Sequence, residues 1–78
     1  MEQSLIEFRL TRAEALVLFD WLVRFDASDA TMTLDKAEQK VLWLLEGALE
    51  KRLVEILAPN YDDILAEARR DVSASMGE

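Results

Sequence analysis

The 78-residue sequence contains no cysteine and no histidine. Without cysteine the chain cannot form a disulfide, a thiolate metal site or a thiol nucleophile. The lack of histidine removes the commonest transition-metal ligand and the most frequent general base. A chain this short buries only about 60% of its surface on folding, and small folds without cross-links depend on good packing or on a partner chain. We therefore expect a domain that is stabilised by packing or by association.

Glycine and proline are also scarce, with two glycines and one proline. Gly47 and Gly77 stand alone, so the chain has no glycine-rich phosphate loop. No apolar run approaches the roughly 20 residues of a membrane-spanning helix, and the first residues lack the basic region of a secretory leader. Together with the absence of cysteine, these features predict a cytoplasmic protein.

Charge of one sign predominates, because 16 acidic residues against nine basic ones give a net charge of −7. Such a surface repels phosphate backbones and anionic membranes. Asp26, Asp29 and Asp35 flank one loop, but they lack the alternating acids, glycine and terminal glutamate of a calcium loop. Helix caps and turns account for all three aspartates. We expect no nucleic acid, membrane, metal, cofactor or small-molecule substrate, and no enzymatic activity.

The first quarter of the sequence predicts a strand followed by a helix. Residues 4–10 alternate, with Ile6, Phe8 and Leu10 on one side, which is typical of a half-buried strand. Thr11 and Glu14 have the spacing of a capping box and predict a helix over residues 12–25. Residues 26–33 are rich in turn formers and end this helix.

Two further helices follow. Thr33 is the expected cap of a helix over residues 34–57, which ends because Pro59 disfavours helical geometry at the residue before it. Asn60 is expected to cap a third helix with a single apolar face, made of Tyr61, Ile64, Leu65, Ala68 and Val72. Residues 1–72 are therefore predicted to form a single helical domain, and residues 73–78 a disordered polar tail. The predicted fold class is mainly α, a small helical bundle of three helices preceded by a short N-terminal β-strand.

A lone strand cannot satisfy its own backbone hydrogen-bonding groups, so residues 4–10 need a partner. We expect the same strand of a second copy as the first choice. Residues 30–34 are a close second, and a strand of another protein is the third.

The helix predicted over residues 34–57 has two apolar faces. The broad one is expected to pack on the core and contains Leu34, Ala37, Val41, Leu42, Leu44, Leu45, Ala48, Leu49, Leu53 and Ile56. Trp43, Gly47 and Val54 lie opposite. Glycine in a helix interior costs about 1 kcal/mol relative to alanine, and a close approach by another group is a natural reason for it. This second face is either an intermolecular contact or a second piece of core, and the sequence favours neither.

The helix predicted over residues 12–25 is apolar nearly all round. Val17, Trp21 and Phe25 make a second face, almost opposite the first. A helix of this kind must be covered on more than one side, and a 78-residue monomer has few elements to do so. We favour an intermolecular contact here over burial at the centre of the domain.

These patterns predict a small acidic protein-interaction module that self-associates as a homodimer and serves as an accessory or adaptor subunit. The residues expected at its interface are Trp43, Gly47, Val54, Val17, Trp21, Phe25, Ile6 and Phe8. The alternative is an acidic inhibitor, immunity protein or antitoxin that covers a basic site on a partner. Small acidic helical proteins of bacteria include such chains, but the resemblance is one of size and charge only.

Overall fold

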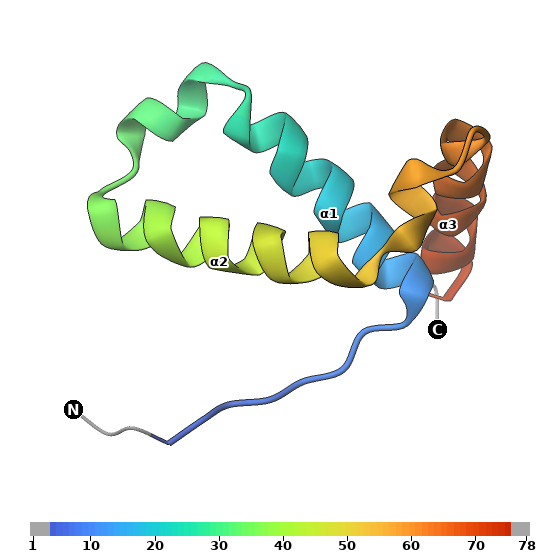
Figure 1. Ribbon diagram of the computed structural model, residues 1–78, viewed down its shortest axis with the longest axis horizontal. Helices are drawn as coiled ribbons and strands as arrows, with labels where there is room; N and C mark the ends of the chain where they lie inside the picture. The colour runs from blue at the N-terminus through green and yellow to red at the C-terminus, as the bar shows by residue number, and fades with distance from the viewer. Residues whose placement is uncertain (1–3, 76–78) are drawn as a thin grey trace.

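The computed structural model describes residues 4–75, and within them the chain is helical. The elements are, in order, α1 (Arg12–Asp26), the 3₁₀ helix η1 (Asp29–Thr33), α2 (Lys36–Arg52), the 3₁₀ helix η2 (Val54–Leu57) and α3 (Tyr61–Ser75). This confirms the mainly helical class. Helices α1 and α2 form a hairpin that is closed by η1, α3 packs beside the first half of α1, and the N-terminal residues run out beneath α2 (Figure 1).

Helix α1 starts where its capping box predicts. The hydroxyl of Thr11 accepts a hydrogen bond from the backbone N–H of Glu14 at 3.1 Å, and the Glu14 carboxylate accepts one from the Thr11 N–H at 2.8 Å. Two N–H groups that the helix itself leaves unpaired are thereby satisfied. The helix then runs to Asp26, one residue beyond the predicted end.

The expected cap of α2 is wrong by two residues. Asp35 caps the helix, accepting from the Glu38 N–H at 2.7 Å, while the Glu38 carboxylate accepts from the Asp35 N–H at 3.1 Å. Thr33 belongs to η1 instead, and its hydroxyl donates to the Ala30 carbonyl. Asp35 prevails because the glutamate three residues later completes a reciprocal capping box, which Thr33 cannot form with Lys36.

The expected end of α2 is also wrong, because the helix stops at Arg52 and not near Leu57. Leu53 leaves helical geometry (φ −103°, ψ 82°), and its side chain is only 2% exposed. The turn drives this side chain into the core. The guanidinium of Arg12 donates to the Arg52 carbonyl at 2.9 Å, which satisfies one of the carbonyls that a helix end leaves open. The chain continues as η2 before α3 begins.

The predicted strand is not present. Residues 4–10 are extended but belong to no sheet, and no strand occurs among residues 4–75. Residues 30–34 cannot act as a partner, because most of that segment lies in η1. Alternation describes the two sides of an extended segment, but a strand also needs a neighbour with which to exchange backbone hydrogen bonds.

Helix α3 follows Asn60, whose backbone carbonyl accepts from the N–H groups of Asp63 and Ile64. The helix continues to Ser75, three residues into the segment that we expected to be a tail, and residues 76–78 lie outside the described part. No helix among residues 4–75 is both long and apolar enough to cross a membrane.

The core lies between α1 and α3, not around α2. Its buried residues are Ala15, Leu16 and Phe19 of α1, Ala68 of α3, and Leu53. Leu22 of α1 is buried as well. No residue within α2 is buried, so this helix is attached to the core along one side and its other sides face outward.

Candidate protein-interaction surface

The chain exposes far more surface than a folded monomer of its mass. Its accessible area is 6600 Å², whereas a folded 8.9 kDa protein is expected to expose about 4,800 Å². Its radius of gyration is 14.3 Å, against about 11.5 Å for a compact domain of 78 residues. An extended N-terminal segment and a helix that faces outward on several sides both contribute to this excess.

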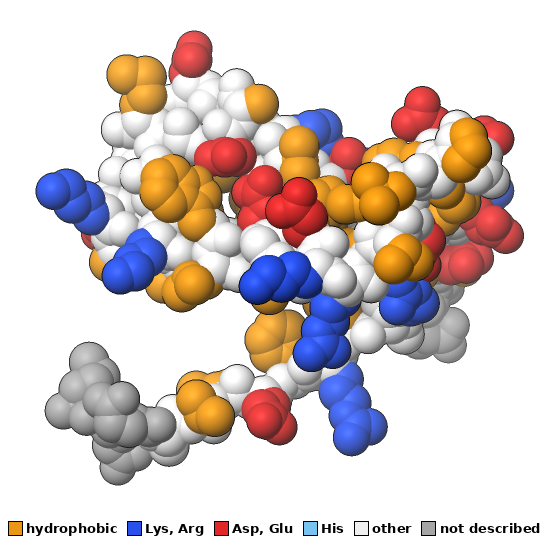
Figure 2. All heavy atoms as spheres, in the orientation of Figure 1, with side chains coloured by type: hydrophobic (Ala, Val, Ile, Leu, Met, Phe, Trp, Pro, Cys, Tyr) orange, Lys and Arg blue, Asp and Glu red, His pale blue; other side chains and the backbone are white. Residues whose placement is uncertain are grey.

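Part of this excess lies on residues 4–10, which we call the arm. Its large apolar side chains are exposed to solvent: Ile6 is 92% exposed and Phe8 71%, and Leu5 is exposed to a similar degree. The arm leaves the body at the start of α1 and runs below α2, separated from it for most of its length (Figure 1, Figure 2). The side chains that suggested a half-buried strand are therefore uncovered in the isolated chain.

Helix α2 carries the second part of the excess. We expected its broad apolar face to pack on the core, and that expectation holds for only half of the face. Leu42, Leu45 and Leu49 are half-buried, but Val41 is 61% exposed, and Ala37, Leu44 and Ala48 are also exposed. Ala37, Val41, Leu45 and Leu49, each four residues after the last, form a continuous apolar line that we call the α2 row.

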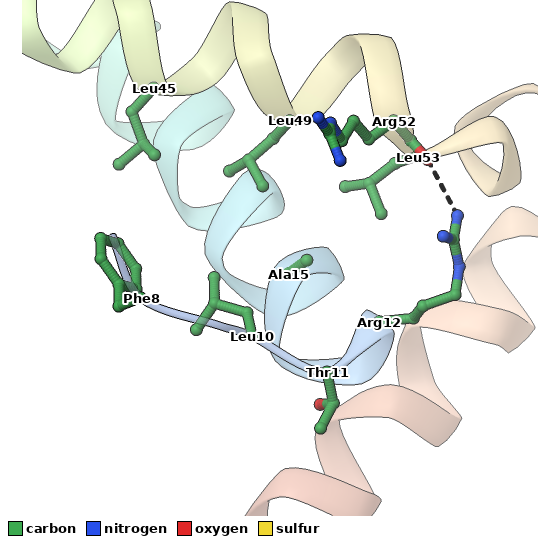
Figure 3. Close-up of a pocket in the computed structure, with 9 residues that line it drawn as sticks. All are labelled: Phe8, Leu10, Thr11, Arg12, Ala15, Leu45, Leu49, Arg52 and Leu53. Carbon is green, nitrogen blue, oxygen red and sulfur yellow. Dashed lines mark hydrogen bonds between the residues drawn. The ribbon is translucent and has the colours of Figure 1, made fainter. Parts of the chain in front are cut away.

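Two hollows lie along the α2 row. One has a volume of about 330 Å³ and lies where the arm joins α1; its lining includes Leu45, Leu49 and Leu53 above and Phe8, Leu10 and Ala15 below. In Figure 3 the leucines of α2 point toward Phe8 and Leu10 with open space between them. The other hollow, about 450 Å³, is a shallow depression on the first half of α2 and is lined by Leu34, Ala37, Glu38, Val41 and Leu42.

The point from which the arm departs is fixed by Arg12. Its guanidinium donates to both carboxylate oxygens of Glu55 at 2.6 Å, in addition to the Arg52 carbonyl. The hydrogen bonds from Arg12 lower the pKa of the Glu55 carboxyl to about 2. Arg12 thus joins the start of α1 to the end of α2 (Figure 3) and, through Glu55, to η2, so the arm extends from an anchored position.

The aromatic residues predicted at the interface gather elsewhere, between α2 and the second half of α1. Trp43 is 53% exposed, and its indole N–H donates to the Asp26 carboxylate at 3.2 Å. Phe25 lines the same small space between the helices, and Trp21 stacks on Phe25 with ring centroids 5.0 Å apart. Trp43 is therefore partly packed against α1 while half of its surface stays open.

The other predicted interface residues do not join this group. Val17 is half-buried against the core. Val54 is exposed on η2, in a different element from Trp43 and Gly47 because α2 ends before it. At Gly47 nothing lies within 4 Å of the position that a Cβ would occupy, so no close approach within the chain explains this glycine. Of the predicted set, Trp21, Phe25 and Trp43 lie together, and Ile6 and Phe8 lie together on the arm.

Sequence reasoning missed the α2 row, because it assigned those residues to the core. A usable signal was present: an apolar face of ten residues is too broad for one helix of a 78-residue monomer to bury. Leu57 of η2, which was expected inside the long second helix, is 84% exposed but lies on neither the arm nor the α2 row.

Charged side chains of both signs surround these surfaces. Lys and Arg side chains line the edge of α2 that faces the arm (Figure 2), and α2 and the arm together carry Arg9, Lys36, Lys40, Lys51 and Arg52. Within residues 4–75 the three salt bridges use other bases: Arg12 pairs with Glu55, and Arg24 and Arg69 both pair with Asp20. α2 and the arm also carry Glu7, Glu38, Glu46 and Glu50, so the surroundings of the α2 row are of mixed charge.

Near Trp43, acidic side chains lie close to one another and affect each other's ionisation. Burial, followed by the charges of Asp26 and Glu50, raises the pKa of Glu46. Asp26 accepts from Trp43 and Asp35 caps α2, while Asp29 stands in the first turn of η1. Across the part of the chain that the structure describes, no three acidic side chains come close enough together to hold a metal ion.

Comparisons with protein-family models, with curated proteins and with solved structures found no match to this chain.

Proposed function

We propose that the chain is a protein-interaction module that associates with a second copy of itself and works as an accessory or adaptor subunit without catalysis. The observation that carries the proposal is the grouping of exposed large apolar side chains on the arm and along α2, where Ile6, Phe8 and Val41 are 92%, 71% and 61% exposed. A cytoplasmic location, which the absence of cysteine favours, is part of the same proposal.

The exposed apolar residues lie in groups, which supports a binding surface and not the scattered exposure of single apolar side chains. Single apolar side chains on a surface are normal, whereas contiguous patches mark interaction sites. The arm contributes Leu5, Ile6 and Phe8, and the α2 row with its neighbour Leu44 lies along the adjacent helix. The buried core itself consists of six hydrophobic residues, so covering more apolar surface adds substantially to a small total.

Solution mass tests this proposal. Light scattering or sedimentation equilibrium between about 1 and 100 µM should give twice the 8.9 kDa chain mass at the upper end of that range, because a standard-sized interface commonly supports micromolar affinity or better. A mass of one chain throughout the range contradicts self-association.

A second candidate is an acidic inhibitor that covers a basic site. One observation favours it: Asp63, Glu67 and Asp71 follow one another at four-residue spacing on α3 and are all exposed. Contacts of this kind are electrostatic and weaken as salt is added. A monomeric chain that binds a basic protein in a salt-sensitive manner would favour this candidate over the first.

A further inference from the structure

We propose that the two copies exchange arms, so that residues 4–10 of each chain lie along the α2 row of the other. This inference rests on the self-association proposed above and specifies which surfaces meet. It requires no β-sheet, because the contact is made by side chains of an extended segment against a helix.

The dimensions of the two surfaces agree. An extended segment advances about 3.3 Å per residue, so the arm spans about 20 Å from its first residue to its last. The α2 row rises about 1.5 Å per residue and spans about 18 Å from Ala37 to Leu49. Ile6, Phe8 and Leu10 recur every 6.6 Å or so, and the members of the row every 6 Å, so successive apolar side chains of the arm meet successive positions of the row.

The hollows of the row provide space for such side chains. The hollow of about 330 Å³ under Leu45 and Leu49 is open although Phe8 and Leu10 of the same chain stand at its edge. In its own chain Phe8 and Leu10 stand across this hollow from Leu45 and Leu49, and Ile6 is 92% exposed. The apolar side chains of the arm therefore do not cover the row of their own chain, and the arm of a second copy supplies the same apolar pattern to it.

The area is sufficient for a dimer. Each large apolar side chain that is transferred from water to a contact removes on the order of 100 Å² of surface. The contact side of the arm offers Ile6, Phe8 and the open part of Leu10, and the facing row offers Val41 with the open parts of Leu45 and Leu49. Because exchange makes this contact twice, these side chains account for about 800 Å², and the backbone and flanking polar atoms of the arm add to that area.

Charge disfavours the simplest competing dimer, in which two α2 helices pack antiparallel about a two-fold axis. In that arrangement the same flank of each helix meets its copy, so the flank that carries Lys40 and Lys51 faces the same two lysines of the other chain. The arm avoids this repulsion because Glu7 and Arg9 balance each other within it. Arm exchange thus brings a segment of zero net charge to the row.

Complementation between two variants tests the exchange. Ile6→Asp with Phe8→Asp alters only exposed arm residues and keeps the row. Ala37→Gln with Val41→Glu alters only exposed row residues and keeps the arm. Each variant alone loses both arm–row contacts, and we expect its self-association to weaken by more than about 30-fold, with helix content unchanged by circular dichroism. Leu57→Asp, equally exposed but outside both surfaces, is the matched control and should associate as the parent chain does.

Mixing the two variants in equal amounts should restore dimers, more weakly than in the parent chain, because the mixed pair contains one intact arm and one intact row. If the arm variant dimerises as the parent does, arm exchange is wrong while self-association survives through another surface. If neither variant associates and the mixture does not either, arm exchange is likewise wrong. A parent chain that is monomeric overturns both proposals.

Disulfide trapping gives an independent result, since the parent has no cysteine. Chains carrying Phe8→Cys and chains carrying Val41→Cys are mixed and oxidised gently, and we expect a covalent mixed dimer. The control pairs Phe8→Cys with Leu57→Cys chains and should give little. Equal yields from the two mixtures overturn the exchange, as does efficient linkage only within a single chain carrying both Phe8→Cys and Val41→Cys, which would place the arm on its own α2.

Discussion

Replacing Gly47 with alanine should stabilise the chain. The position lies in the interior of α2, its backbone does not have a positive φ, and an added Cβ meets no atom within 4 Å. The helix therefore gains the difference in propensity between alanine and glycine, about 0.8–1 kcal/mol, with no packing penalty to offset it. For a domain of 60–100 residues a gain of about 1 kcal/mol raises Tm by about 4–8 °C.

Urea unfolding followed by circular dichroism measures the effect. With a slope of about 1 kcal/mol per molar urea for so small a protein, the midpoint of unfolding should rise by about 0.8–1 M urea. The titration is repeated at several protein concentrations, so that stability gained from association is separated from stability of the chain. A midpoint that stays the same or falls refutes the reasoning, because it means that the side chain meets something in the folded chain.

The dissociation constant of the Gly47→Ala dimer tests the prediction from the sequence that Gly47 lies at an interface. The α2 row lies on the opposite side of the helix from Gly47, so arm exchange predicts an unchanged dissociation constant. A partner ring or backbone packed against the glycine predicts weaker association in a more stable chain. Solution mass over a dilution series distinguishes the two results.

Four further changes give checkable results. Trp43→Ala should reduce the free energy of unfolding by about 2–3 kcal/mol, because the covered half of the indole contributes about 100 Å² of burial. Self-association of this variant should persist. A variant that is folded but monomeric would show that Trp43 lies at the interface. Glu55 is stabilised as the carboxylate by Arg12, so its contribution is complete above about pH 4.5 and is lost as pH falls toward its folded pKa of about 2; acid titration of stability in Glu55→Gln should lack this component. Glu46 has a raised pKa, so its charged form opposes folding above that pKa and the penalty disappears as pH falls; Glu46→Gln should raise Tm at pH 7 and leave it nearly unchanged at pH 4. Self-association of two chains of charge −7 should tighten between about 0.05 and 0.5 M NaCl, measured by sedimentation, whereas binding of a basic partner should weaken.

The parts of the fold that local chemistry determines were predictable. The capping box of Thr11 and Glu14 gave the start of α1, and the apolar face of α3 gave its orientation, since Ala68 is buried and Tyr61, Ile64 and Leu65 pack beside it. In both cases a few neighbouring residues contain the whole physical cause.

The parts that depend on distant contacts were not. The early end of α2 follows from the burial of Leu53 against α1 and α3, which no local pattern reveals. The predicted strand was wrong for a related reason. The alternating pattern of the arm shows which residues share a side, but it does not show whether another strand lies beside them. For the candidate site, the surplus of apolar residues was evident from the sequence, but their division between the arm, the α2 row and the aromatic group around Trp43 needed the structure.

The position of the core between the first and last helices has a consequence for how the chain folds. Leu16 and Ala68 share one core, so its central contacts have a long sequence separation although the fold is helical. Helical proteins with mostly local contacts fold fastest, and loop closure must precede any gain from distant ones. During synthesis the apolar side of α1 therefore stays uncovered by the core until α3 has been made.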